Sequence, residues 1–171
     1  MKRITSILLL IFTCMTAMGG QIEHPSLLFT RQTMQSADNN PMNAGYKAEL
    51  LNKADGLLKS NDLSKLDYLS LAFSMTGDRK YSDHIKEVLI NATKAQSWEN
   101  SEMMLRNPAW HTELNVAHRS FACGLAYDVI YHTLSKSERM TIAEGLQRLA
   151  VKPAMEDWVN DDTRIHSLNS M

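Results

Sequence analysis

"HTELNVAHRSFACGLAYDVIYHTLSKSER", residues 111–139, combines three histidines and one cysteine with a row of apolar positions. It is either a catalytic or metal-binding stretch, or a helical hairpin inside a larger fold. At about 100° per residue, one arc of a helix is apolar and consists of Leu114, Ala117, Phe121, Ala122, Leu125 and Val129. The opposite side carries few charges and consists of Ser120, Cys123, Gly124, Tyr127 and Tyr131. Both faces therefore predict neighbours, as expected for an inner helix.

The second half of this hairpin has a clear start signal. Ser135 and Glu138 have the spacing of a capping box, in which each side chain accepts a hydrogen bond from the other residue's backbone N–H. The residues expected to face inward are Ile142, Ala143, Leu146, Leu149 and Ala150. Those expected to face outward are Lys136, Arg139, Glu144 and Arg148. Pro153 is predicted to end this helix.

Residues 62–94 repeat the order of an inner helix followed by an amphipathic one. Asp62 is a suitable N-cap for a helix that ends at Gly77, and residues 78–94 carry charges on one face. The motifs LAF at 71–73 and LAY at 125–127 give a period near 54 residues. A further helix is expected at 44–60, and residues 97–113 are expected to be a loop with two tryptophans.

Hairpins of this kind cannot bury their apolar faces alone. They stack into solenoids or close into α/α toroids. Glycine and proline are sparse, with 7 and 4 residues, and no stretch alternates apolar and polar residues. The predicted fold class is therefore all-α, with antiparallel αα-hairpin repeats that form part of an incomplete α/α toroid.

Residues 1–19 have the features of a secretory signal peptide. Lys2 and Arg3 precede an apolar run that ends in small residues, as a signal peptidase requires. We expect cleavage after Gly19, which leaves a mature domain at residues 20–171. The protein is accordingly predicted to be exported, to the periplasm or the medium.

The cysteine and charge content argue against a lipid anchor, an internal disulfide and a nucleic-acid-binding surface. Cys14 makes a poor lipid-anchor site because the residue before it is not small, and the apolar run is short for a stable membrane span of about 20 residues. Without the leader only Cys123 remains, so stability must come from core packing and not from an internal disulfide. The mature chain has 16 basic and 19 acidic side chains, a formal net charge of −3, which gives no basic patch for nucleic acid.

The histidines and the cysteine of the opening stretch are weak candidates for chemistry. His111, His118 and His132 are seven or fourteen residues apart, but histidines two helical turns apart are separated by roughly 10 Å, too far to share one metal ion. No HExxH motif occurs. We expect hydrogen-bonded histidines and no metal site. Cys123 has no base near it in sequence and is predicted to be a buried, inert thiol.

The loop NPAWHTELN, residues 107–115, is a better candidate for ligand binding. It enters the inner helix, where Thr112 is predicted to be the N-cap and where backbone N–H groups attract anions. Trp110 offers a flat apolar face on which a sugar ring can stack. The alternative is that this tryptophan only locks the hairpin. Residues 155–171 add Arg164 and His166 within a segment that otherwise has the composition of a solvated connecting loop.

Several of these segments resemble one known family. EHPSLLFTRQ at 23–32 is similar to the HPRLLFT opening of bacterial polysaccharide lyases of the heparinase II/III type, including their alginate-lyase relatives. Three further segments resemble successive helices of that family's N-terminal α/α toroid: LAFSMTGDRKYSDHIKEVL, LAYDVIYHTLSKSERMTIAEGL and DDTRIHSLNSM. The likeness spans nearly all of the mature chain, and HPSLLF is its most specific part.

The resemblance implies β-elimination on a uronic acid-containing polysaccharide of the glycosaminoglycan or alginate type. In such a reaction an Asn, His or Arg neutralises the uronate carboxylate, and a Tyr or His removes the neighbouring proton. The family's neutralising Asn lies in an HNW-like motif shortly after a segment like RIHSLNSM. Because this sequence stops there, we expect an N-terminal fragment without catalytic residues and without a cofactor. Its expected partners are an acidic polysaccharide or oligosaccharide and the remainder of the lyase chain.

The residues predicted to bind substrate are Trp110, His111, Glu113, Arg119, Arg164 and His166. One alternative function is a non-catalytic helical-repeat module that binds carbohydrate or protein. Another is an α/α-toroid glycoside hydrolase, which needs a pair of catalytic carboxylates. Asp157, Asp161 and Asp162 are too loosely placed in the sequence to favour that enzyme.

Overall fold

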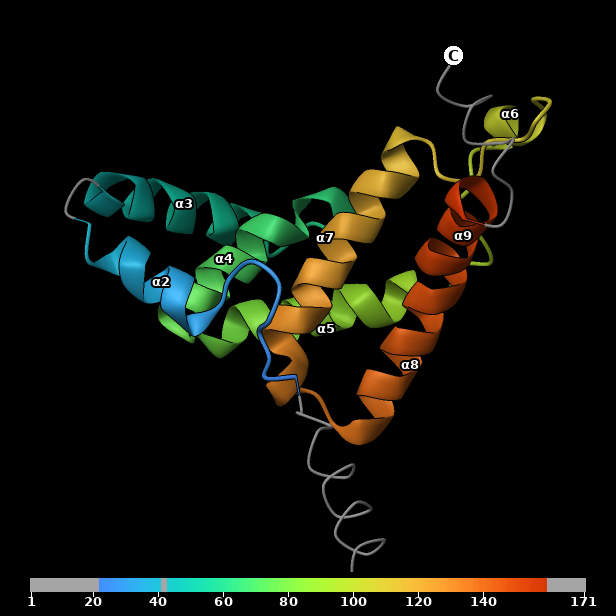
Figure 1. The fold of residues 1–171 in the computed structure, drawn as a ribbon. Coiled ribbons are helices and arrows are strands. Elements are labelled where there is room, and N and C mark those ends of the chain that lie inside the picture. Colours follow the sequence, from blue (N-terminus) through green and yellow to red (C-terminus); the bar gives the residue numbers. More distant parts are fainter. Residues whose placement is uncertain (1–21, 41–42, 160–171) are drawn as a thin grey trace, which may run out of the picture.

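The computed structural model describes residues 22–40 and 43–159 (Figure 1). These residues form helices and no strand, which confirms the all-α prediction. The predicted signal peptide and residues 160–171 lie outside the described residues. In the described part of the chain, no helix has the length and apolarity needed to cross a membrane.

The helices follow one another with short connections. The first half contains α2 (Arg31–Asp38), α3 (Asn43–Leu57), the 3-10 turn η1 (Leu63–Lys65), α4 (Leu66–Thr76) and α5 (Arg79–Ala92). The second half contains α6 (Ser101–Met104), α7 (Leu114–Ile130), the 3-10 turn η2 (Tyr131–Thr133), α8 (Lys136–Leu146), the π-helical turn η3 (Gln147–Val151) and α9 (Lys152–Trp158). The helix expected at 44–60 is present as α3, whereas residues 97–113 contain the short α6 and are not only a loop.

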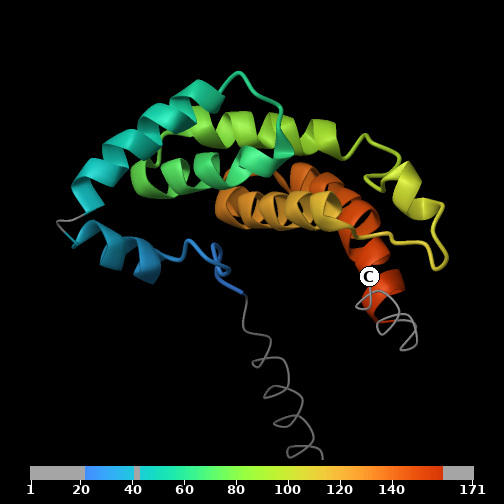
Figure 2. The ribbon, with the colours of Figure 1, turned by 90° about the horizontal axis from the view of Figure 1, so that it is seen from above.

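Helix α7 is the centre of the packing. It contacts α4 and α5 on one side, and α8 and η3 on another. Helix α5 also contacts both α4 and α8. Seen from above, α4 and α7 lie on the inside of a curve whose outer edge follows α3 and α5 (Figure 2).

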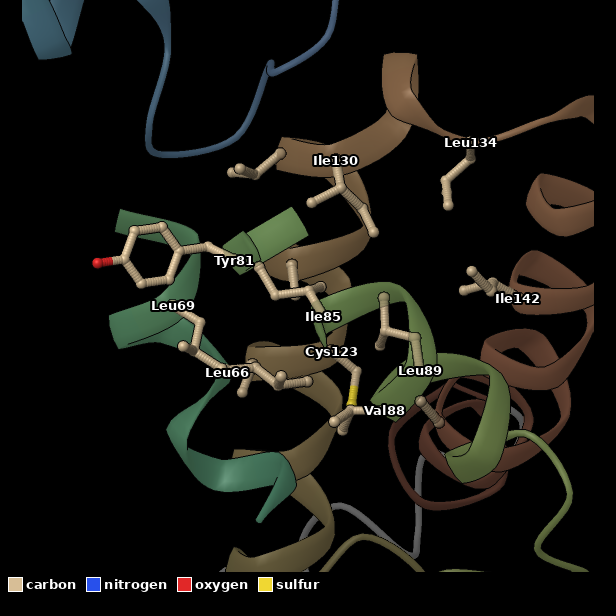
Figure 3. Packing of buried hydrophobic residues seen from close by; sticks show 14 of the residues in the cluster. Leu66, Leu69, Tyr81, Ile85, Val88, Leu89, Cys123, Ile130, Leu134 and Ile142 are labelled. Carbon is tan, nitrogen blue, oxygen red and sulfur yellow. The ribbon is translucent and has the colours of Figure 1, made fainter. Parts of the chain in front are cut away.

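The hydrophobic core lies where α4, α5, α7 and α8 meet (Figure 3). Cys123 is fully buried in this cluster, to which Val88 of α5 also belongs (Figure 3). Burial raises the pKa of the Cys123 thiol to about 12, although the positive charge of Arg119 acts in the opposite direction. The thiol is therefore protonated at neutral pH, which confirms the prediction of an inert cysteine.

The predicted helix ends are mostly confirmed. Gly77 ends α4 in the left-handed conformation, with φ of 67°, where a side chain would be strained. The capping box of Ser135 and Glu138 is formed at the start of α8. Asp62 accepts a hydrogen bond from the Ser64 N–H and so caps η1, which leads into α4.

The predicted apolar arc of α7 is partly wrong. Leu114 and Phe121 are 64% and 62% exposed, and Ala117 is exposed as well. Ala122, Leu125 and Val129 of the predicted arc are buried, together with Val116, Cys123, Ala126 and Ile130. The buried residues of α7 therefore come from both sides of the helix, and the exposed part of the predicted arc lies toward its N-terminal half. Ala143 on α8 was also expected inside and is exposed.

Pro153 does not end the last helix, in contrast to the prediction. The chain passes from α8 through η3 into α9, and Pro153 is at the start of α9, where its missing N–H is tolerated. In the π-helical turn the Lys152 N–H donates to the Gln147 carbonyl, five residues earlier, and Pro153 follows directly after this bond. Helical structure consequently reaches Trp158.

Two residues fix α8 and η3 against the end of α5. The Arg148 guanidinium donates hydrogen bonds of 2.8 to 2.9 Å to the carbonyl oxygens of Thr93, Ala95 and Gln96. Arg148 is exposed, as expected, and its guanidinium also caps the C-terminal end of α5, where a positive charge is favourable. Gly145 approaches Thr93 so closely that an added Cβ would lie 2.2 Å from the Thr93 Cγ2 atom.

The N-terminal arm, residues 22–30, is held on α7 by the buried side chain of Asp128. The Asp128 carboxylate accepts hydrogen bonds from the backbone N–H groups of Ser26 and Leu27 at 2.8 and 2.9 Å. It also accepts one from the Ser26 hydroxyl and lies 2.5 Å from His24 Nδ1. We call these contacts the arm clamp.

The arm clamp also involves an aromatic stack and a shifted pKa. The His24 ring stacks on the Tyr131 ring at 3.9 Å between centroids, and the Arg139 guanidinium lies 4.4 Å from the Tyr131 centroid. Burial acts to raise the pKa of Asp128, but hydrogen bonds from Leu27, His24 and Ser26 outweigh it and lower this pKa below its usual value. Asp128 is therefore ionised at neutral pH.

Candidate functional site

The predicted substrate-binding residues lie in two places and partly outside the described residues. Trp110 and His111 are in the segment before α7, and Glu113 is the residue immediately before that helix. Arg119 lies further along α7 and is exposed. Arg164 and His166 were also predicted and lie outside the described residues.

The segment before α7 is fixed by Asp157, a fully buried residue of α9. One carboxylate oxygen accepts a hydrogen bond from the His111 N–H at 3.2 Å. The other accepts hydrogen bonds of 2.6 Å from both the N–H and the hydroxyl of Thr112. The indole N–H of Trp158 donates to the Thr112 hydroxyl oxygen at 2.9 Å. We call these contacts the loop clamp, and they hold His111 in place.

Thr112 is not the N-cap of α7, in contrast to the prediction. The N-cap is Glu113, whose carboxylate accepts hydrogen bonds from the Asn115 N–H at 2.9 Å and from its side-chain amide at 3.1 Å. Thr112 is already committed to Asp157, which explains why the next residue takes the capping position. A carboxylate of the protein itself therefore occupies the start of α7, where we had expected N–H groups to attract an external anion.

His111 forms an ion-pair type of contact with Glu99. The His111 Nδ1 atom lies 2.5 Å from a Glu99 carboxylate oxygen, and the two side chains are 19% and 24% exposed. The other Glu99 oxygen accepts a hydrogen bond of 2.8 Å from the Ser97 hydroxyl. Because Nδ1 then carries the proton, the lone pair of a neutral His111 is on Nε2. No hydrogen bond to Nε2 is found within residues 22–40 and 43–159.

Glu99 and His111 line a pocket of about 320 Å³, here called the His111 pocket. Residues of η3 and α9 complete the lining, among them Arg148, Lys152, Pro153 and Glu156. The π-helical turn is therefore part of the wall, and such turns are frequent at functional sites.

The charged side chains of the His111 pocket differ in whether they could bind a ligand. The Arg148 guanidinium donates hydrogen bonds to carbonyl groups at the end of α5. Its contribution to the pocket is therefore mainly its positive charge. Lys152 is exposed and forms no ion pair within the described residues. Glu156 and Glu99 are the negative groups. Lys152 and His111 are thus the groups best placed to hold an acidic ligand.

Trp110 is near this pocket in sequence but does not line it. Its backbone N–H donates to the Met103 carbonyl at 3.0 Å, and its ring centroid lies 5.6 Å from the Arg106 guanidinium. Its indole N–H is buried and has no partner in the described part of the protein. These contacts tie the segment before α7 to the end of α6.

Arg119 lies on a different part of α7, close to η1. Hydrogen bonds from Ser64 are the main reason why the pKa of Asp62 is lowered, and the positive charges of Lys65 and Arg119 add to that effect. The structure therefore separates Arg119 from the His111 pocket, whose lining it does not join.

His111 is the one residue of the pocket lining that was predicted as a site residue; its charged neighbours Glu99, Arg148, Lys152 and Glu156 were not. Lys152 and Glu156 have the spacing of neighbours on one helix face, which is visible in the sequence. The sequence does not show that these two residues line a pocket with His111. The predicted helix end at Pro153 separated Lys152 from Glu156, so they were not expected on one helix. Nothing in the sequence pairs Glu99 with His111, since loop residues have no periodicity.

The donor groups of the described residues do not favour a metal centre. No group of three or more His, Cys, Asp or Glu side chains among them is arranged to hold a metal ion. Histidines 111, 118 and 132 also do not share one helix, because His111 precedes α7 and His132 lies in η2. No protein-family model matches the sequence, and no curated protein matches it. The charged and titratable groups of the pocket are thus two carboxylates, Glu99 and Glu156, together with His111, Arg148 and Lys152.

Proposed function

We propose that this chain is the N-terminal part of an exported polysaccharide lyase and that its His111 pocket binds a uronate unit of an acidic polysaccharide. The observation that carries this proposal is that the exposed Lys152 lines the same pocket as the hydrogen-bonded pair of His111 and Glu99. A cation and an imidazole in one pocket match a ligand that has one carboxylate and several hydroxyl groups.

The positions of the lyase-like segments support the same proposal. The HPSLLF motif contacts Asp128, and Asp128 belongs to the LAYDVI part of the second lyase-like segment. The first such helical segment forms α4 and α5, which pack against α7 and α8. Segments that resemble one family are thus in direct contact, as parts of one folding unit are. The curved arrangement of α4 and α7 is compatible with a portion of an α/α toroid (Figure 2).

Binding without elimination is the expected activity of this chain. Elimination needs neutralisation of the uronate carboxylate together with a base at the neighbouring carbon, and loss of one member of such a set removes most of the rate. His111 is paired with Glu99, and Lys152 is a flexible cation and not a rigid, planar donor. The non-catalytic carbohydrate-binding module predicted as an alternative uses this same pocket.

The test is a binding titration with uronate oligosaccharides. Alginate and hyaluronan hexasaccharides are titrated into the protein, with cellohexaose as the neutral comparison. We expect the acidic sugars to bind more tightly, and to lose affinity as salt is added because the contact is electrostatic. Lys152→Ala and His111→Ala should each weaken binding about tenfold, whereas the exposed Lys136→Ala at the opposite end of α8 should leave it unchanged.

The same samples test the absence of turnover. Unsaturated uronate products absorb ultraviolet light, and their absorbance should stay at the level of buffer with heparin, chondroitin, hyaluronan and alginate. Equal affinity for acidic and neutral sugars, or equal losses in all three variants, would contradict the uronate site. Product formation that is lost in His111→Ala would contradict the expectation of a binding-only chain.

A further inference from the structure

The segment that carries Glu99 is attached to η3 by Arg148. Arg148, Glu99 and His111 line the same pocket. The Arg148 guanidinium donates hydrogen bonds of 2.8 to 2.9 Å to three carbonyl oxygens between residues 93 and 96, shortly before Glu99 in the chain. A guanidinium presents its donors in a rigid planar fork, so bonds to three acceptors restrict both the position and the orientation of this segment. We call residues 93–99 the Glu99 segment.

Contacts within the Glu99 segment connect this attachment to the Glu99 carboxylate. The Ser97 hydroxyl accepts a hydrogen bond of 2.9 Å from the Glu99 N–H and donates one of 2.8 Å to a Glu99 carboxylate oxygen. Between them, Trp98 is 6% exposed and belongs to the hydrophobic core. The direction of the Glu99 side chain therefore depends on the position of Ser97, which directly follows the carbonyl groups that Arg148 binds.

The other Glu99 oxygen contacts His111, whose backbone is held separately. The His111 Nδ1 atom lies 2.5 Å from Glu99, whereas the His111 N–H donates to Asp157 at 3.2 Å. The backbone of His111 is thus fixed by the loop clamp, and its ring takes a partner from the Glu99 segment. In a neutral imidazole, the hydrogen bond that one ring nitrogen makes decides which nitrogen carries the proton.

We infer that Arg148 is a positioning residue of the His111 pocket. By binding the carbonyl groups of residues 93–96, it places Glu99 against Nδ1 and so keeps the lone pair of a neutral His111 on Nε2. This role goes beyond positive charge, which Lys152 also brings to the pocket. The inference rests on the proposed function only for the use of that lone pair, since the contacts themselves involve no ligand.

Nuclear magnetic resonance of the ring nitrogens tests this inference without a ligand. The spectra are recorded at a pH high enough for the imidazoles to be neutral, where a protonated and an unprotonated nitrogen have well-separated shifts. In the unchanged protein, we expect the Nδ1 atom of His111 to have the shift of a protonated nitrogen. Glu99→Ala gives the reference for a lost partner and should move the Nδ1 shift toward that of an unprotonated nitrogen. Arg148→Ala should move it in the same direction.

Two further variants separate position from charge. Arg148→Lys keeps the positive charge but not the planar fork, so it should also move the Nδ1 shift. Lys152→Ala removes a positive charge from the same pocket and none of the bonds to residues 93–96, so it should leave the Nδ1 shift unchanged. Arg148 is exposed, so neither of its substitutions should prevent folding, and Arg148→Lys alone decides the test if Arg148→Ala does not fold.

An unchanged Nδ1 shift in the folded Arg148 variants would overturn the positioning role, and so would an equal change in Lys152→Ala. The uronate titration separates this inference from the proposed function. If the Arg148 variants move the Nδ1 shift but the unchanged protein binds no uronate, the positioning role stands and the proposed function fails. If the protein binds uronate and the Arg148 variants leave the Nδ1 shift unchanged, only the positioning role fails.

Discussion

Two buried aspartates each hold a segment of the chain by hydrogen bonds to its backbone, in different surroundings. Asp128 on α7 holds the N-terminal arm, and Asp157 on α9 holds the segment before α7. Each carboxylate accepts hydrogen bonds from two successive backbone N–H groups and from one hydroxyl group. The arm clamp adds a histidine, and the loop clamp adds the indole of Trp158 behind Thr112.

The surroundings of the donors differ more than the carboxylates do. In the arm, Ser26 and Leu27 are exposed, at 64% for Leu27, so water can replace the carboxylate if the arm moves away. In the loop, Thr112 is 8% exposed and lies between α6 and α7, so its N–H and hydroxyl stay buried when the acceptor is lost. The cost of removing a buried acceptor therefore depends on whether its donors can reach water.

The largest effect is predicted for Asp157→Ala. It leaves the His111 and Thr112 N–H groups and the Thr112 hydroxyl without their acceptor, and it also creates a small cavity. We expect the free energy of unfolding to fall by about 3 kcal/mol, or enough to prevent folding. Urea unfolding followed by circular dichroism measures this change.

Asp157→Asn provides the matched control for that prediction. The amide keeps one acceptor oxygen but turns an NH₂ group toward a donor, so we expect an intermediate loss. A loss below about 1 kcal/mol in Asp157→Ala would mean that water enters the site, and the contrast between the two clamps would then disappear.

A smaller and more local effect is predicted for Asp128→Ala. The arm should detach, and the free energy of unfolding should fall by about 1–2 kcal/mol. Amide hydrogen exchange should accelerate strongly at Ser26 and Leu27 and remain unchanged at Thr112. Acceleration over the whole chain would show that the arm clamp supports the core as the loop clamp does.

The pH dependence of stability sharpens the comparison for the arm clamp. The pKa of Asp128 is lower in the folded protein than in the unfolded chain, so its stabilising contribution is complete above the unfolded pKa of about 4. The contribution is lost as the pH falls through the lower, folded pKa. The difference in urea midpoint between the protein and Asp128→Asn should therefore shrink as the pH is lowered from about 5 to about 2. A constant difference over this range would contradict the lowered pKa.

Local signals in the sequence account for most of what was predicted correctly. The capping box at Ser135, the left-handed Gly77 and the buried Cys123 depend on a few neighbouring residues or on composition, and all three are confirmed. The exposure of Phe121 was not predicted, because the apolar arc alone does not show which part of α7 the neighbouring helices cover. The passage of a helix through Pro153 depends on a π-helical turn, for which the sequence has no simple signal.

The candidate site was predictable only in part for a related reason. His111 was predicted from its loop, which is a local feature. Its partner Glu99 and the pocket residue Lys152 come from segments 12 and about 40 residues away in the chain. Asp157 had been considered only as a weak candidate for glycoside hydrolysis, whereas the structure gives it a buried structural role. Contacts between distant loops depend on how the helices that flank them pack. The spacing of apolar residues along the sequence does not reveal such contacts.

The smallest effect distinguishes the two hydroxyl groups of the clamps. The Ser26 hydroxyl reaches Asp128 at 3.2 Å and is only partly buried, so Ser26→Ala should cost about 0.5 kcal/mol. The Thr112 hydroxyl is 2.6 Å from Asp157 and also accepts the Trp158 N–H, so Thr112→Val should cost about 1 kcal/mol more because it removes a buried hydrogen bond and leaves the part-buried indole N–H without its acceptor. Urea midpoints of the two variants, measured side by side, give this difference. Equal costs would show that the indole finds water, and that the deeper burial of the loop clamp does not extend to its hydroxyl group.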